Sequence, residues 1–175
     1  RVYGPDLMTL VMQESVARGW RHFFYGGANG TAERLRAVLT GKFPGLQVAG
    51  TCEPPFRPLN DSEQAALTAQ VAAAKPDFFW VGLSTPKQER FMAENLARLD
   101  TTVMLGVGAA FDMLAGTKQQ APLWMQRSGL EWLYRLGQEP RRLGPRYLVN
   151  NPLFVLRVMA QLTGLRKYEL AKGEP

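Results

Sequence analysis

Arginines and aromatic residues alternate near the end of the chain, in the stretch GLEWLYRLGQEPRRLGPRY (residues 129–147). Arg135, Arg141, Arg142 and Arg146 lie there beside a tryptophan and two tyrosines. A guanidinium group stays charged and binds phosphate oxygens through two parallel hydrogen bonds, so the cluster suits a phosphate or diphosphate ligand. Arginine among aromatics is also compatible with nucleic acid, a lipid surface or packing between helices. The stretch alone leaves these four interpretations open.

The positive charge of the sequence is concentrated in the same region. The whole chain has a net charge of +6. Residues 1–119 hold 12 Lys and Arg against 11 Asp and Glu, whereas residues 120–175 hold 9 against 4. We therefore expect two domains, a nearly neutral body (1–119) and a basic C-terminal appendage (120–175) that favours an anionic partner.

Composition and length are those of a folded protein with one sizeable core. The 175 residues are 46% hydrophobic and 21% charged, which excludes a disordered chain. Cys52 is the single cysteine and has no partner for an internal disulfide. The single histidine, His22, has no His or Cys companion at metal-ligand spacing, so we expect no metal site of the zinc type. No run of apolar residues is long enough for a transmembrane helix.

Short apolar runs of strand length alternate with helical patterns through the body. Most are apolar at every position, as in a parallel sheet that is buried on both faces. The expected strands are 22–25, 46–51, 77–83 and 101–107, and the expected helices are 6–18, 31–39, 62–74 and 86–99. This order predicts an α/β fold with a Rossmann-like, mostly parallel sheet flanked by helices. Because a helix precedes the first clear strand, the sheet is expected to lack an N-terminal portion.

The appendage is expected to be helical, and one helix of the body carries a cap signal. Thr31 is placed to cap the helix that follows the first strand. Beyond the body, the pattern predicts a helix at 121–139, a basic hinge at 140–146 and a last helix at about 151–165. The last helix has an apolar stripe, suited to a membrane interface or to packing on the body, and is too short to span a bilayer.

Three loops that follow strands carry residues suited to ligand binding, because open sheets bind ligands at the carboxyl ends of their strands. In GGANGT, Gly26 and Gly27 let backbone N–H groups approach a phosphate, although the turn lacks the full GxGxxG spacing. In GLSTPKQE, Gln88 lies in the first turn of a helix. In GVGAAFD, Gly108 permits close approach and Asp112 offers oxygens to sugar hydroxyls. Tight turns and helix caps explain each loop as well.

Taken together, these segments resemble the WecG/TagA/CpsF glycosyltransferase family. The resemblance covers nearly the whole chain, in the family's order. The matching segments are RVYGPDLM (1–8), FFYGGANG (23–30), GTCEPPF (50–56), GLSTPKQE (82–89), GVGAAFD (106–112) and APLWMQRSGLEWLYRLGQEPRRLGPRY (121–147).

The resemblance implies an inverting hexosyltransferase. Such an enzyme moves a sugar of the N-acetylmannosamine type from a UDP donor to a polyprenyl-diphosphate-linked sugar, in bacterial surface-polysaccharide or wall-polymer synthesis. It implies a cytoplasmic, peripheral protein on the inner face of the plasma membrane, with no cofactor and no nucleic-acid partner. A homo-oligomer is compatible with it.

The resemblance also implies a set of site residues. Arg141, Arg142 and Arg146 would hold diphosphate charge, and Gln88 and Arg142 would support catalysis. The full substrate-binding set is Arg1, Gly26, Gly27, Gln88, Gly108, Asp112, Arg141, Arg142 and Arg146. The family's catalytic aspartate lies upstream of the RVYGPDL segment, so the catalytic base is not identified in this chain. We therefore expect the chain to be part of a longer enzyme and to be weakly active or inactive alone.

Two other classes of function remain open from the residues. A nicotinamide-dependent oxidoreductase needs an acidic residue after the second strand to hold ribose, and Glu53 is a candidate. A nucleic-acid-binding module is favoured by the basic appendage. Against it, Trp124, Trp132 and Tyr134 recur at helical spacing, which is typical of packing.

Overall fold

The computed structural model describes residues 3–166, without the side chains of residues 142 and 146. The chain forms two compact units, Arg1–Gln119 and Gln120–Pro175, called here the body and the appendage. The body is a layered α/β structure, and the appendage consists of helices.

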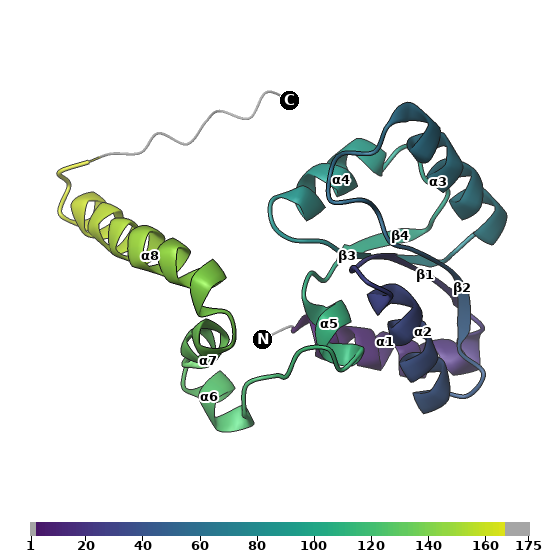
Figure 1. The fold of residues 1–175 in the computed structure, drawn as a ribbon, viewed down its shortest axis with the longest axis horizontal. Helices are drawn as coiled ribbons and strands as arrows, with labels where there is room; N and C mark the ends of the chain where they lie inside the picture. The colour runs from purple at the N-terminus through teal and green to yellow at the C-terminus, as the bar shows by residue number, and fades with distance from the viewer. Residues whose placement is uncertain (1–2, 167–175) are drawn as a thin grey trace. The chain divides into compact units, whose positions relative to one another are not determined.

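The body is built around a four-stranded sheet in which all neighbouring strands are parallel (Figure 1). The strand order is β2-β1-β3-β4. The strands are β1 (Arg21–Gly26), β2 (Gln47–Cys52), β3 (Phe78–Gly82) and β4 (Val103–Gly106). The predicted fold class is confirmed, and each predicted strand is present with ends within one or two residues.

Helices cover both faces of the sheet and explain why its strands are apolar throughout (Figure 1). Phe24 and Trp80 face one layer, while Phe23 and Phe79 face the other, and all four are fully buried. The first layer is α1 (Gly4–Arg18), α2 (Thr31–Lys42) and α5 (Ala110–Leu114), and the second is α3 (Asp61–Ala74) and α4 (Lys87–Asn95). Burying large aromatic side chains on both faces is the main source of the body's stability.

Two details of the helices differ from expectation. The cap of α2 is Gly30, in a left-handed conformation (φ 82°), and Thr31 is the first helical residue. The Thr31 hydroxyl donates to the Ala28 carbonyl at 2.6 Å and caps no helical N–H. Helix α4 ends at Asn95, before the expected end at residue 99. The buried Asn95 side chain donates to the Phe91 carbonyl and accepts a hydrogen bond from Gln64 of α3.

The amino end of β1 contains a buried histidine. His22 Nδ1 accepts a hydrogen bond from the Trp80 indole at 3.0 Å, and its ring stacks on Phe78. Burial lowers the pKa of His22 to about 4, against a smaller opposing effect of Asp77. The imidazole is therefore neutral at pH 7, with its proton on Nε2.

The appendage contains α6 (Leu123–Arg127), α7 (Glu131–Gln138) and α8 (Pro140–Leu162). The single predicted helix at 121–139 is wrong, because Gly129 adopts a left-handed conformation (φ 75°) that separates α6 from α7. The predicted hinge at 140–146 is also wrong. Pro140 occupies the first turn of α8, where its missing N–H leaves no hydrogen bond unmade, and the helix continues from there.

Side chains of the appendage pack together on one side and lie exposed on another. Trp132 packs edge-to-face on Tyr147, and Leu143 is buried, so these aromatics contribute to packing. Along the second half of α8, the predicted apolar stripe is exposed among the described residues of the appendage. Its exposed members are Leu153, Phe154, Leu156, Met159 and Leu162. Among the described helices, none combines the length and the apolar character that crossing a membrane would need.

Candidate functional site

All four strands of the body end at the same edge of the sheet, because they are parallel. Gly26 at the end of β1 is paired with Gly82 at the end of β3, and Val81 is paired with Gly106 at the end of β4. The loops that leave these strands therefore start side by side. We call this part of the body the carboxyl edge, and it is where open α/β sheets bind ligands.

The turn after β1 packs closely against the end of the neighbouring strand β3. Gly26 has φ 131°, a conformation open to glycine alone, and a Cβ atom added there would lie 2.5 Å from the Gly82 carbonyl oxygen. The Gly27 N–H donates to the same Gly82 oxygen at 3.2 Å. Gly26 and Gly27 are thus required for close packing of two strand ends, which is the tight-turn interpretation of GGANGT.

A carboxylate of the protein occupies the N-terminus of α2. Glu53, which follows β2, accepts hydrogen bonds from the N–H groups of Gly30 at 2.9 Å and Ala32 at 2.6 Å. These are the donors that a phosphate would use at a helix N-terminus. Glu53 is also the residue that a nicotinamide-dependent enzyme would direct to ribose. Its engagement with α2 weighs against both a phosphate at this turn and a dinucleotide.

The turn after β4 is held by a side chain. Gln88 lies in the first turn of α4, as expected, and its Oε1 atom accepts a hydrogen bond from the Gly108 N–H at 2.9 Å. A Cβ atom on Gly106 would collide with the end of the Gln88 side chain. The structure therefore brings Gln88 and Gly108 together. The Gln88 amide group is half-buried, lies against Gly106 and Gly108, and is free to move because it ends a flexible side chain.

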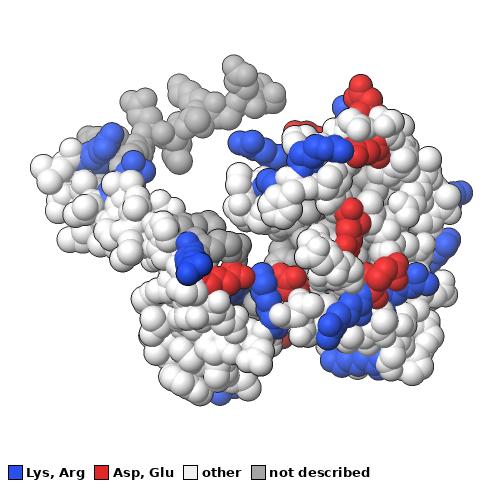
Figure 2. All heavy atoms as spheres, viewed as in Figure 1, with Lys and Arg blue, Asp and Glu red and all other residues white. Residues whose placement is uncertain are grey.

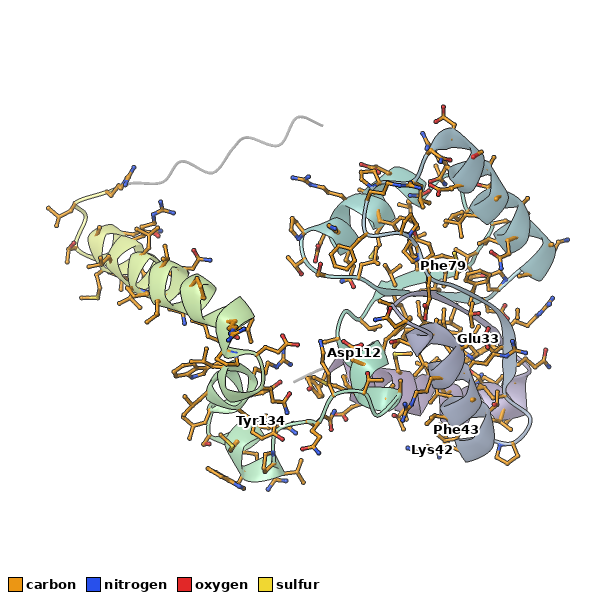
Figure 3. The ribbon with its side chains drawn as sticks, in the orientation of Figure 1. Glu33, Lys42, Phe43, Phe79, Asp112 and Tyr134 are labelled. Carbon is orange, nitrogen blue, oxygen red and sulfur yellow. The ribbon has the colours of Figure 1, made fainter. Side chains whose placement is uncertain are left out.

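Asp112 lies on α5 (Figure 3), four residues after Gly108. Its carboxylate forms an ion pair with Lys118 at 3.0 Å, and its carbonyl accepts the N–H groups of Thr117 and Lys118. This is the local-turn role that the sequence left open for Asp112. The contact of Asp112 with a sugar hydroxyl stays a prediction.

Residues 53–60, called here the bridging loop, connect two parts of the carboxyl edge. At one end Glu53 is bound to the start of α2. Further along, the Lys87 ammonium group at the start of α4 donates to the Phe56 carbonyl at 2.9 Å and lies 4.4 Å from the centre of the Phe56 ring. Sequence reasoning singled out Glu53 and the GTCEPPF segment but missed the contact of Phe56 with Lys87; an aromatic residue close after a strand was the available signal.

The charge on the body is mixed, in agreement with its composition. Figure 2 shows acidic and basic side chains interspersed over the visible face of the body.

Hydrogen bonds from Arg57 and from the Asn60 backbone lower the pKa of Glu63 to about 2. Burial raises the pKa of Cys52, and of Tyr25, above their usual values. Among the described residues no group of three His, Cys, Asp or Glu side chains is placed to hold a metal ion.

The predicted arginines belong to the appendage and to the start of the chain. Arg141 is exposed in the first turn of α8. Arg1 lies outside the described residues, and so do the side chains of Arg142 and Arg146. Arg135 forms an ion pair with Glu131 within α7 and has a structural role there. The structure thus brings Gln88 and Gly108 into contact and holds Gly26 and Gly27 on the same edge of the body.

Comparison with known proteins identifies the family. The model of the glycosyl transferase WecG/TagA/CpsF family matches residues 1–168, which include all four loops of the carboxyl edge and the whole of α8. The chain belongs to this family. The resemblance expected from the sequence is confirmed.

Two relatives illustrate the similarity. An N-acetylglucosaminyldiphosphoundecaprenol N-acetyl-β-D-mannosaminyltransferase of Bacillus spizizenii is 30% identical over 175 residues, which is 100% of this chain and 63% of the relative. A protein of the same name from Staphylococcus aureus (strain MW2) is 26% identical over 167 residues, covering 95% of this chain and 63% of the relative. The chain thus spans just under two thirds of the length of these WecG/TagA/CpsF relatives.

Proposed function

We propose that the chain is the nucleotide-sugar-binding part of an inverting hexosyltransferase. The enzyme transfers a sugar of the N-acetylmannosamine type from a UDP donor to a polyprenyl-diphosphate-linked N-acetylglucosamine. The product enters a bacterial wall polymer or surface polysaccharide. The acceptor and the transferred sugar follow the names of the two relatives, and the UDP donor follows the family expectation.

The observation that carries this proposal is the Gln88–Gly108 contact at the carboxyl edge, within a family match that spans the edge. A primary amide has both a donor and an acceptor, and only its Oε1 atom has a partner in the described contacts, the Gly108 N–H. The Nε2 donors are suited to a phosphate or sugar oxygen that lies above Gly106 and Gly108. Gly108 permits the close approach that a bulky donor needs, whereas Gly106 is covered by the ends of the Gln88 and Met92 side chains.

The arginines of the appendage supply the positive charge for the diphosphate. Arg141 and Arg142 occupy the first turn of α8, where the helix dipole also favours an anion. In sugar transfer, negative charge develops on the departing nucleoside diphosphate. Guanidinium groups that neutralise this charge lower the activation barrier more than they strengthen ground-state binding.

The exposed apolar stripe of α8 fits a peripheral membrane protein. A helix with an apolar face and nearby arginines lies in the headgroup region and not across the bilayer. We propose that this stripe rests on the inner face of the plasma membrane, where a lipid-linked acceptor is found. A homo-oligomer that covers the stripe is the competing arrangement, and sedimentation without lipid distinguishes the two.

The donor is tested by titrating the full chain with UDP, NAD and a short single-stranded DNA, using calorimetry. We expect binding that is selective for UDP. Gln88→Ala and Arg142→Ala should each weaken it about tenfold, because each removes hydrogen bonds to the ligand. Arg157→Ala is the matched control, since it removes an exposed arginine from the later part of α8. Binding of NAD or DNA in preference to UDP would contradict the proposal.

Transfer is tested with UDP-N-acetylmannosamine and a short-chain polyprenyl-diphosphate N-acetylglucosamine. We expect at most slow UDP release that depends on both substrates, because the catalytic base is not identified in this chain. The product should have an anomeric configuration opposite to that of the donor. Retention of configuration, measured by NMR of the product, would refute the inverting mechanism and leave the donor assignment standing.

A further inference from the structure

We propose that Phe56 is a stacking platform for the base of the nucleotide donor, held in place by Lys87. The inference deepens the proposed function, because it assigns a base-recognition residue to the same carboxyl edge. It rests on the exposure of the Phe56 ring, on the fixation of the bridging loop and on the place of Lys87 beside Gln88.

Phe56 is the most exposed large apolar side chain in the described part of the chain, at 88%. Its ring lies on the surface while every other phenylalanine of the body is buried or half-buried. One face of the ring is covered by the Lys87 ammonium group at 4.4 Å from the ring centre. The other face is open to a planar ligand.

The bridging loop is fixed at several points, so the exposed Phe56 ring is held in a defined position. Glu53 binds two N–H groups of α2, and Lys87 binds the Phe56 carbonyl. After Phe56, both guanidinium nitrogens of Arg57 donate to the Glu63 carboxylate, at 2.7 and 2.8 Å. Three prolines, at positions 54, 55 and 58, restrict the loop further. A surface that is ordered before binding loses little conformational entropy when a ligand arrives.

The loop places the ring next to the proposed diphosphate site. Lys87, which holds Phe56, is the residue immediately before Gln88, which holds Gly108. A nucleoside diphosphate has a planar base at one end and a diphosphate at the other. The Phe56 ring, held by Lys87, and the Gln88 amide at the next position of α4 match these two ends.

The charge around Phe56 favours a base over a lipid chain. Inserting this ring into hydrocarbon would carry the Lys87 ammonium group with it, at a large desolvation cost. A neutral base on the open ring face avoids this cost, and stacking of a base on an aromatic ring is favourable for every base.

The inference is tested by calorimetric titration of UDP and of pyrophosphate with the full chain and with Phe56→Ala. Loss of a stacked base weakens binding about tenfold or more. We expect this loss for UDP and no change for pyrophosphate, which has no base. Phe56→Trp should retain UDP binding, because the larger ring restores the stack. Leu96→Ala is the matched control, since Leu96 is a similarly exposed apolar residue of the body (71%) at the far end of α4.

Four outcomes overturn the inference. If UDP binds Phe56→Ala and the unmodified chain equally, Phe56 does not contact the base, although the proposed function survives. If the substitution weakens UDP and pyrophosphate alike, the loop shapes the phosphate site and not the base site. If it abolishes binding to phosphatidylglycerol vesicles and leaves UDP unchanged, the ring is a lipid contact. If the unmodified chain binds no nucleoside diphosphate, both the proposed UDP donor and the proposed role of Phe56 are contradicted.

Discussion

The two glycine turns of the carboxyl edge look alike in sequence and differ in what fills them. The turn after β1 is closed by the protein itself, through the Gly27 N–H on Gly82 and the Glu53 carboxylate on the start of α2. The turn after β4 is covered by the ends of two flexible side chains, Gln88 and Met92. Backbone contacts resist displacement, whereas an amide at the end of a side chain can exchange its partner for a ligand. The second turn is therefore the better candidate for binding.

The difference between the turns predicts opposite effects of adding one methyl group. Gly26→Ala places a Cβ atom 2.5 Å from the Gly82 carbonyl oxygen at φ 131°, so two strand ends must separate. We expect the free energy of unfolding to fall by about 3 kcal/mol or more, measured by urea denaturation.

Gly106→Ala is the matched substitution on the other turn. Its Cβ atom would meet the far ends of the Gln88 and Met92 side chains, which can move. We expect a loss of less than about 1 kcal/mol in stability, together with weaker UDP binding because Gln88 is displaced. Equal losses of stability in Gly26→Ala and Gly106→Ala would contradict the proposed difference between the turns, since both turns would then be rigid.

Much of the fold was predictable from the sequence, because the features that determine it are local and repeated. Continuous apolar runs, such as 77–83, identify strands that are buried on both faces. The last helix was predicted at about 151–165, but its start at Pro140 was not. A proline is usually taken as a helix break unless it is known to occupy the first turn, as Pro140 does.

The candidate site was less predictable than the fold. The sequence places Gln88 in a helix start, and this is confirmed. That Glu53 fills the start of α2 depends on two strands lying side by side, which no local pattern encodes. The same holds for Lys87 and Phe56, which are 31 residues apart in sequence.

Acid should destabilise the sheet by protonating His22, which lies at the amino end of β1, away from both turns. The folded pKa of His22, about 4, is below its usual value of 6.5. The unfolded chain therefore binds the proton more readily, so stability is full above about pH 6.5 and falls as pH decreases toward 4. Between pH 7 and 5 we expect a loss of about 2 kcal/mol in the free energy of unfolding.

Urea titrations of the unmodified chain and of His22→Asn at both pH values measure this loss. Asparagine keeps an acceptor for the Trp80 indole and does not titrate, so the variant should lose much less stability over the same interval. An equal loss in both proteins would assign the acid sensitivity to other groups and leave the sheet interior uninvolved.

A smaller effect than that of acid comes from the carboxylate that closes the first turn. Glu53→Gln keeps the size of the side chain and removes the charge that faces the α2 dipole. We expect a loss of about 1 kcal/mol in stability, smaller at high salt because the interaction is at the surface. Glu33→Gln is the control, since Glu33 lies in the same turn of α2 but accepts from the Thr51 hydroxyl and caps no N–H.

Ligand titration of Glu53→Gln decides whether the first turn belongs to the site. If the turn is only structural, UDP affinity should be unchanged in both Glu53→Gln and Glu33→Gln. A tenfold loss of UDP affinity in Glu53→Gln alone, with stability retained, would mean that the carboxylate orients the bridging loop toward the ligand. The two turns would then form one site, with Glu53 acting on the nucleotide through the loop that carries Phe56.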